Sequence, residues 1–259
     1  MKHFKLFFYS IYGSVYFRIL IGFLRWFFFF KIKRNFKFLT VKNSVEGTIP
    51  YNKTAFLRFP LSDFTMKRMD RLIAVIKATE FIGDNYNFLI IGPRTESDVM
   101  RLKFNYPEAT INAIDIISYS PWIDLQDAHH TNFTSNSFEC IISGWVLKYS
   151  NDKERMIAEM IRIVKNEGLI AIGIEYANDQ SRSFAEKHKG GVKYLNQDDI
   201  AFEEVNSVTD IKALLKRIDA NYRIIYEYDA LLRNKSTEDI YRITKLHSTQ
   251  IMVCFQIFK

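Results

Sequence analysis

The chain has 259 residues, of which 48% are hydrophobic and 25% charged, with 36 basic and 29 acidic side chains and a net charge of +7. This length fits one large domain or one domain with an appendage, and the composition excludes a wholly disordered, collagen-like or polytopic membrane protein. Residues 1–40 hold eight basic side chains and no acidic one, so the rest of the chain carries 28 basic and 29 acidic groups. Because this body is almost neutral, nucleic acid is not expected as a partner.

The N-terminal segment combines apolar residues with basic ones. Residues 6–30 are apolar apart from two arginines, and no cleavage site of a secretory signal peptide follows them. Five polar or small residues recur in this segment at spacings of 4, 4, 4 and 3, so on a helix they would form one narrow stripe: Ser10, Ser14, Arg18, Gly22 and Arg25. A cluster of basic residues follows the apolar run: Lys31, Lys33, Arg34 and Lys37.

Three interpretations of this segment are open. A helix lying on an anionic membrane surface is the preferred one, because basic residues flank its wide apolar face. A spanning helix is the second, and the positive-inside rule leaves the body at the cytoplasmic face in that arrangement too. In the third, the stripe faces solvent and the apolar face packs on the protein's own core.

We divide the chain into the N-terminal segment 1–40, a connecting segment 41–62 and a body 63–259. The connecting region lacks clear periodicity. In the body, the hydrophobic pattern predicts helices over 63–80, from 95 to about 105, over 152–166 and from 207 to about 218. It predicts strands over 87–92, 110–116, 138–143, 168–176, 222–228 and 251–258. This alternation predicts a three-layer α/β fold with a mainly parallel sheet. The last strand is apolar on both faces, which favours an interior position.

Two strand ends point to a ligand site. The first strand ends in Gly92-Pro93-Arg94, directly before a helix, where a glycine lets the backbone approach a ligand and a helix N-terminus offers free N–H donors. The second strand ends in Asp115, where an acid can accept hydrogen bonds from ribose hydroxyls. Open α/β sheets bind ligands at this edge.

Two further patterns carry a resemblance to a known family. Asp127-Ala128 is followed by Asn136-Ser137-Phe138-Glu139, and the block from Glu159 to Lys165 is followed by Gly168. Over roughly residues 85–176 the sequence resembles the class I S-adenosylmethionine-dependent methyltransferases, particularly their type-11 group. The resemblance implies a Rossmann-like sheet, mainly parallel with an inserted antiparallel last strand, and S-adenosyl-L-methionine as cofactor.

The resemblance also assigns roles at the strand ends. Gly92, Pro93 and Arg94 would pass the methionine moiety of the cofactor, and Asp115 would hold the ribose hydroxyls. The other cofactor-binding residues are Ile116 under the adenine, Asp127 at the adenine amino group, Ala128 through its backbone, and Ser143 and Gly144 at the mouth of the site. His129 and Glu175 are candidate bases for an acceptor hydroxyl, and each also has a structural interpretation as a loop histidine or a strand-end acid. The polar residues 177–200 could form a substrate lid.

The sequence departs from the family at two places. A single Gly92 replaces the glycine-rich loop, and Asp115 lies only 12 positions before Asp127, so we expect a short loop in place of the usual helix between the second and third strands. The implied strand order separates Cys140 from Cys254 by two strand spacings, about 9–10 Å, which is beyond the reach of a disulfide. Both cysteines lie in apolar runs and are expected as reduced thiols in the cytosol. No zinc-like spacing of Cys and His occurs, so no metal is expected.

We therefore expect a methyltransferase at the cytoplasmic face of the membrane. The expected acceptor is an amphiphilic small molecule, preferably a sugar hydroxyl of a lipid-linked glycan, with a quinone-type or lipid acceptor second. The alternative is a methyltransferase-like protein without catalysis that works as a membrane-associated interaction module. A nicotinamide-dependent oxidoreductase is disfavoured, because the glycine-rich pyrophosphate fingerprint is absent.

Overall fold

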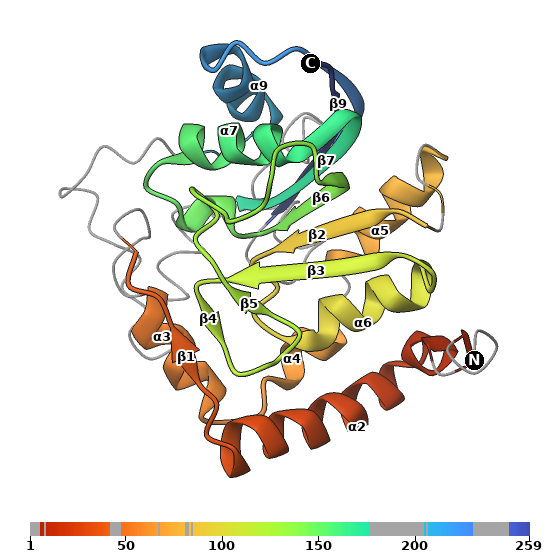
Figure 1. Cartoon of the computed structure of the whole chain (residues 1–259), viewed down its shortest axis with the longest axis vertical. Coiled ribbons are helices and arrows are strands. Elements are labelled where there is room, and N and C mark those ends of the chain that lie inside the picture. Colours follow the sequence, from red (N-terminus) through yellow and green to blue (C-terminus); the bar gives the residue numbers. More distant parts are fainter. Residues whose placement is uncertain are drawn as a thin grey trace.

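A seven-stranded sheet lies at the centre of the molecule, with the strand order β5-β3-β2-β6-β7-β9-β8 (Figure 1). The computed structural model describes the whole chain except residues 1–5, 8, 42–47, 67, 81–82, 84, 177–204, 206 and 230–248. The strands are β2 (Asn87–Ile91), β3 (Thr110–Asp115), β5 (Asp124–Leu125), β6 (Phe138–Gly144), β7 (Val164–Tyr176), β8 (Tyr222–Asp229) and β9 (Thr249–Ile257). All neighbours run parallel except β9, which is antiparallel to both β7 and β8. The predicted fold, with its inserted last strand, is confirmed.

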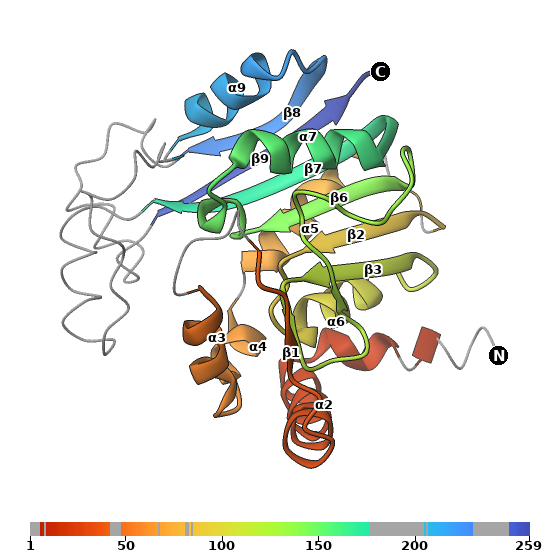
Figure 2. The same ribbon diagram turned by 60° about the vertical axis from the view of Figure 1, so that its left-hand side comes forward.

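Helices cover both faces of this sheet (Figure 2). On one face, α5 (Arg68–Ala78) and α6 (Glu96–Asn105) pack their apolar residues on Phe88, Ile90 and their neighbours. On the other face, α7 (Lys153–Ile163) and α9 (Val208–Arg217) pack on a second apolar layer. The caps follow the sequence: the Thr95 side chain accepts a hydrogen bond from the Ser97 N–H, and that of Ser207 accepts from the Asp210 N–H. The three layers position the carboxyl ends of the strands at one edge.

The structure differs from the predicted elements at two places before the sheet. The helix predicted over 63–80 is two helices, α4 (Leu61–Thr65) and α5, and the Arg101 guanidinium donates hydrogen bonds to the carbonyl oxygens of Phe64 and Met66 at 3.0 and 2.6 Å where α4 ends. The connecting segment contains a helix, α3 (Thr48–Phe56), for which the sequence shows no periodicity. Phe56 is fully buried against Trp26 and Tyr119, so tertiary packing decides this helix.

The crossing from β3 to β5 contains no helix over residues 116–126, all of which the structure describes. The expected short loop is therefore confirmed. Within it β4 (Ile117–Ser118) pairs antiparallel with β1 (Lys37–Phe38) of the N-terminal segment. This separate two-stranded pairing attaches the N-terminal segment to the crossing loop, beginning two residues after Asp115.

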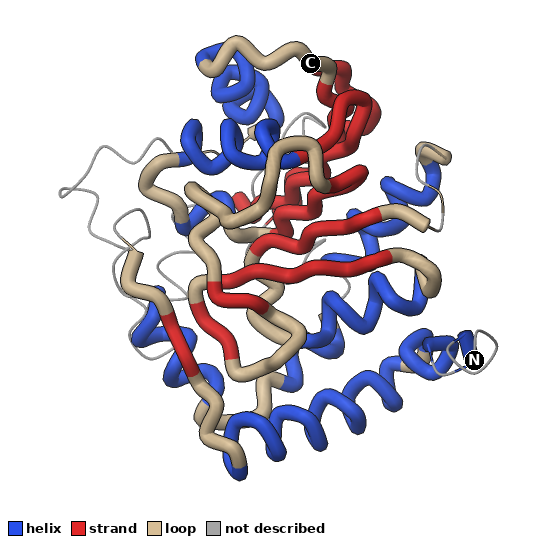
Figure 3. The backbone as a smooth tube through the Cα atoms, viewed as in Figure 1, coloured by secondary structure: helices blue, strands red, loops and turns tan. Residues whose placement is uncertain are grey.

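The N-terminal helices lie alongside α6, on the side of the molecule where the sheet ends with β3 and the short edge strand β5 (Figure 1 and Figure 3). They are η1 (Ile11–Gly13), α2 (Val15–Trp26) and η2 (Phe27–Ile32), of which η2 is a π-helical turn. The interpretation that places the polar stripe in solvent is wrong, because Arg18 and Gly22 are buried and Arg25 pairs with Glu96 of the body. A Cβ atom on Gly22 would lie 2.1 Å from Cε1 of Phe64 in α4, so only glycine allows this close packing. Within the described part of the chain, no helix combines the length and hydropathy that a bilayer crossing requires.

The two cysteines lie on separate strands, as the resemblance implies. Cys140 in β6 is adjacent to Leu169 in β7, and Cys254 in β9 is adjacent to Ala171 of the same strand, so β7 lies between them. Both are free and buried. Burial raises the pKa of the Cys254 thiol to about 12 and that of Cys140 well above its usual value, which keeps both thiols protonated and unreactive.

Candidate functional site

The carboxyl ends of β2, β3 and β6 meet at one edge of the sheet. Ile91 at the end of β2 lies in register with Ile114 of β3 on one side and with Ser143 of β6 on the other. The Gly92 N–H then donates to the carbonyl oxygen of Ile114 at 2.8 Å. The fold therefore brings Gly92, Asp115 and Ser143 together, although 51 residues separate the first from the last.

Asp115 is a half-buried carboxylate that backbone N–H groups hold in place. Its Oδ2 accepts from the Arg94 N–H at 3.0 Å and its Oδ1 accepts from the Ile117 N–H at 3.2 Å. Burial raises the pKa of Asp115 to about 6, although the hydrogen bonds from these backbone groups act in the opposite direction. Two carboxylate oxygens offer about four lone-pair sites, so Asp115 retains the capacity to accept from two further hydroxyl groups.

Gly92 adopts a left-handed conformation, with φ of +69°, and a Cβ atom on it would lie 2.7 Å from the Cβ of Val146. The side chain of Val146, which follows β6, therefore occupies the space beside Gly92 that a Cβ atom would need. Arg94 and Trp145 also have positive φ values, of 53° and 60°. Left-handed non-glycine residues are strained, and such strain is concentrated at binding sites. Here it lies at the ends of two adjacent strands.

Arg94 extends its side chain towards α4. Its guanidinium forms a two-pronged ion pair with the Asp63 carboxylate, in which Nε and Oδ2 lie 2.9 Å apart. Pro93, before it, is buried. Sequence reasoning missed Asp63, because an acid inside a predicted amphipathic helix carries no signal that distinguishes it from a solvated one.

Asp127, His129 and Ser150 form a chain of hydrogen bonds. Nδ1 of His129 lies 2.6 Å from Oδ1 of Asp127, and Nε2 lies 2.6 Å from Oγ of Ser150, which follows η3 (Leu147–Tyr149). His129 is only 7% exposed, so its interpretation as an exposed loop histidine is wrong, whereas His130 is exposed. The sequence contained no signal for Ser150, because its partner lies 21 residues away.

The remaining predicted site residues lie around this edge. Ile116 packs in the aromatic cluster of Phe56 and Tyr119, and Ala128 packs on the core beneath α7. Gly144 pairs with Gly173 of β7, and Glu175 lies further along the same strand, opposite Gln250. The residues of the predicted substrate lid, 177–200, lie outside the described part of the chain.

A buried ion pair connects the N-terminal helix to this edge. Nε of Arg25 lies 2.5 Å from Oε2 of Glu96, the first residue of α6, and the Glu96 side chain is fully buried. The hydroxyl of Ser120 also donates to Glu96, and the Arg25 guanidinium lies 3.7 Å from the ring centroid of Trp122. Sequence reasoning placed Arg25 in the polar stripe but missed its partner, because 71 residues separate the two.

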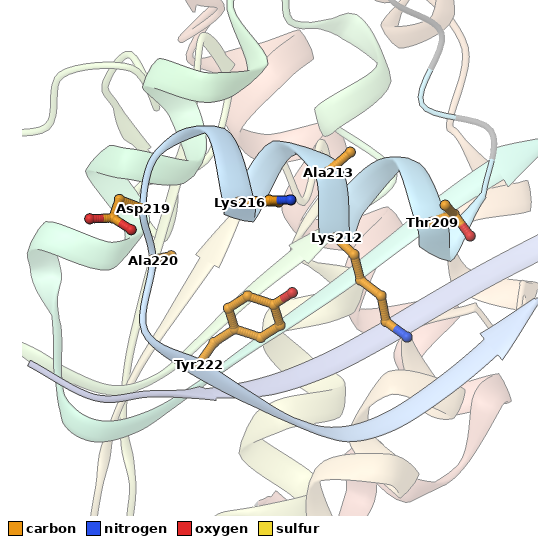
Figure 4. Close-up of a pocket in the computed structure, with 7 residues that line it drawn as sticks. All are labelled: Thr209, Lys212, Ala213, Lys216, Asp219, Ala220 and Tyr222. Carbon is orange, nitrogen blue, oxygen red and sulfur yellow. The ribbon is translucent and has the colours of Figure 1, made fainter.

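Two surface hollows lie away from the strand ends. One, of about 410 Å³, lies between α9 and β8 and is lined by Lys212, Lys216 and Tyr222 among others (Figure 4). The other, of about 720 Å³, lies between α5 and the outer strands, against Val75 and Tyr228. Neither includes a residue of the predicted site.

The comparisons with known proteins agree with this geometry. A family model described as a methyltransferase domain matches residues 105–172. A putative sarcosine dimethylglycine methyltransferase from Galdieria sulphuraria is similar in structure, with a TM-score of 0.52 and 12% identity over 76% of this chain and 87% of that one. The resemblance to class I methyltransferases is confirmed. S-adenosylmethionine-dependent methyl transfer is the general activity that the match supports, with S-adenosylmethionine as the cofactor.

Other solved structures show how widely this fold is used. The CurJ carbon methyltransferase has a TM-score of 0.51 and 12% identity over 74% of this chain and 54% of its own. The [4+2]-cyclase SpnF has a TM-score of 0.51 and 11% identity over 93% of this chain and 96% of its own. A search of curated proteins finds no significant match. Because one fold carries different reactions, the acceptor has to be argued from the site.

The residues at the strand ends fit a polar, nucleoside-containing ligand. The Ser143 hydroxyl and the Trp145 indole N–H are buried, and neither has a hydrogen-bond partner among the described residues. A buried polar group without a partner costs about 1–3 kcal/mol, so a ligand that satisfies it gains affinity. Together with the free lone pairs of Asp115, these groups present both acceptors and donors at one edge.

Proposed function

We propose that this protein transfers the methyl group of S-adenosylmethionine to an oxygen atom of an amphiphilic acceptor held close to a membrane. The preferred acceptor is a sugar hydroxyl of a lipid-linked glycan, and a quinone-type or lipid acceptor is second. The position of Asp115 carries the cofactor part of the proposal, because its carboxylate, which backbone N–H groups hold in place, lies at the same edge of the sheet as Gly92 and the orphaned hydroxyl of Ser143, with β2 between Asp115 and Ser143. The exposed apolar face of α2 supports the acceptor part.

In this proposal Asp115 accepts hydrogen bonds from the two ribose hydroxyls of the cofactor. Oδ1 of Asp127 is already used by His129, so Oδ2 would accept from the adenine amino group. Ile116 would contact the adenine, with Ala128 and Gly144 at its border. Gly92, Pro93 and Arg94 would border the methionine moiety, and Val146 would have to leave the surface of Gly92 for a direct contact. When bound, S-adenosylmethionine supplies an electrophilic methyl group on a sulfonium.

The protein must also take a proton from the acceptor hydroxyl. Asp127 fixes the His129 tautomer with its proton on Nδ1, which leaves Nε2 as the atom that can accept a proton. Nε2 is bonded to the Ser150 hydroxyl, so the acceptor hydroxyl would have to replace Ser150 before His129 could act. Glu175 is the other candidate base, at a strand end where an acceptor could be held.

Calorimetry with S-adenosylmethionine and S-adenosylhomocysteine tests the cofactor site. The folded protein should bind both, and Asp115→Ala should weaken binding by about 1–3 kcal/mol, because it removes charge-assisted hydrogen bonds to the ribose. Lys216→Ala, an exposed side chain in the last turn of α9, serves as a control that should leave affinity unchanged. Unchanged affinity in a folded Asp115→Ala protein would refute the ribose assignment. Absence of binding by the unmodified protein would favour a methyltransferase-like module without catalysis.

A further inference from the structure

The N-terminal helix turns its polar stripe inwards. Arg18 is 8% exposed and donates to the Gly13 carbonyl oxygen at 3.1 Å, while Arg25 pairs with the buried carboxylate of Glu96. Trp26, also buried, donates its indole N–H to the carbonyl oxygen of Phe56 at 3.2 Å. The Arg25–Glu96 pair attaches one face of α2 to the body, and the Trp26 hydrogen bond attaches the same helix to α3, so the opposite face points away from the body.

The outward face of α2 and η2 is apolar and exposed. Tyr16, Leu20 and Leu24, each one turn after the last, are 81%, 52% and 56% exposed. More than two-fifths of each neighbouring side chain is also exposed: Phe17, Phe23, Phe27, Phe28 and Ile32. Contiguous apolar patches of this kind mark interaction sites, because water contact with so many large side chains is unfavourable. We call these eight residues the outward apolar face.

Cations border the outward apolar face. Lys31, Lys33, Arg34 and Lys37 are all exposed, and Lys33 lies 5.6 Å from the ring centroid of Phe28. No acidic residue occurs before Glu46. The partner of this surface must therefore combine an apolar interior with a negative rim. A second copy of this chain does not provide a negative rim, because a symmetric dimer through this face would bring two basic clusters together.

We propose that the outward apolar face docks in the plane of an anionic lipid bilayer, with the basic cluster on its headgroups. Helices with a wide apolar face and flanking cations bury that face about 5–10 Å into the boundary between headgroups and acyl chains. The helix lies flat, because Arg25, Glu96 and the packing of Gly22 on Phe64 hold its other face on the body. This docking stands independently of the methyl-transfer proposal.

The docked surface borders the candidate site. Phe38, 48% exposed, follows the basic cluster and pairs with Ile117, two residues beyond Asp115. A bilayer under α2 and η2 would therefore lie beside the carboxyl ends of the strands. An acceptor with a membrane-bound tail could present its polar part to the site from there, and this consequence alone rests on the proposed function.

Vesicle flotation with the full chain tests the docking. The unmodified protein should bind phosphatidylcholine vesicles that contain 30% phosphatidylserine, a composition chosen for the test, and bind pure phosphatidylcholine vesicles more weakly. Leu20→Gln with Leu24→Gln removes apolar area without changing charge and should lower the partition coefficient at least about tenfold. Lys33→Gln with Arg34→Gln should lower it about fivefold per residue on anionic vesicles, and high salt should remove this difference.

Tyr226→Gln, on the opposite edge strand β8, is the matched control, because Tyr226 is also an exposed large side chain, at 36%. It should bind vesicles like the unmodified protein, and circular dichroism should show that each variant remains folded. The proposal is refuted if the unmodified protein does not bind anionic vesicles, or if Tyr226→Gln weakens binding as much as the α2 variants. It is also refuted if gel filtration shows a dimer that the Leu20 and Leu24 changes dissociate, because a second copy would then occupy the face.

Discussion

The helices α2 and α7 are both amphipathic, yet they bury opposite faces. α7 packs Met156, Ile157 and Met160 on the sheet. α2 buries Arg18 and Gly22 and leaves its most continuous apolar row exposed. In α7 the apolar partner is the protein's own sheet, whereas in α2 the body offers the buried carboxylate of Glu96 and the helix α4, which Gly22 approaches closely.

This comparison shows what a hydrophobic pattern can tell. A period of 3.6 residues identifies which side of a helix is apolar. The period does not show whether the apolar side packs on a protein core or on a membrane surface, because both environments favour the burial of apolar side chains. The inward stripe of α2 also means that residues 1–40 contribute to the packing of the body, so their removal is expected to disturb the fold as well as any membrane contact.

The largest expected difference is between apolar truncations on the two helices. Ile157→Ala on α7 should lower the free energy of unfolding by about 2–5 kcal/mol, because it opens a cavity in a fully buried layer. Leu24→Ala on α2, where the side chain is 56% exposed, should change it by less than about 0.5 kcal/mol. Urea unfolding without lipid measures both. A loss above about 1 kcal/mol for Leu24→Ala would show that the outward apolar face is covered in the free protein.

The ion pairs of α2 and α7 should also differ in their contribution to the free energy of unfolding. Glu96→Ala should cost about 3 kcal/mol, because it leaves the partly buried Arg25 without its partner. Glu154→Ala breaks a pair between α7 and Arg217 of α9, in which both side chains are more than a third exposed. That change should cost no more than about 0.5 kcal/mol. Equal losses in urea unfolding would contradict the inward orientation of the stripe.

The smallest expected effect is a pH dependence where the N-terminal segment meets the sheet. Burial raises the pKa of Asp115 to about 6, so its carboxylate loses its charge as the pH falls through about 6. Affinity for S-adenosylmethionine should be constant above pH 7 and weaken a few-fold towards pH 5, since the charged form accepts the ribose hydrogen bonds more strongly. The same raised pKa means that this group's contribution to stability falls as the pH rises from about 4 to about 6.

Calorimetry of Asp115→Asn supplies the control for this pH dependence. Asparagine keeps an acceptor oxygen but does not titrate, so its affinity should be weaker and flat between pH 5 and 8. A pH step that persists in the variant would assign the titration to another group.

Local periodicity allowed most of the sheet to be predicted. Apolar runs such as 87–92 and 138–143 form strands wherever they are buried, and the apolar last strand lies inside the sheet as its two-sided pattern indicated. The short crossing after Asp115 followed from a count of residues alone. The alignment of Gly92, Asp115 and Ser143 at one edge also followed, because parallel strands bring their carboxyl ends together.

The tertiary structure alone decided which face of α2 is buried, where α4 ends and how His129 is engaged. Each depends on partners far apart in the chain: Glu96 for Arg25, the Arg101 guanidinium for the carbonyl oxygens of α4, and Ser150 for His129. A buried ion pair or hydrogen bond is determined by the distance between two groups in space, and no spacing along the sequence encodes that distance. Hydrophobic periodicity is a local property, so the sequence by itself determined the elements and their order, while the fold decided which polar groups meet.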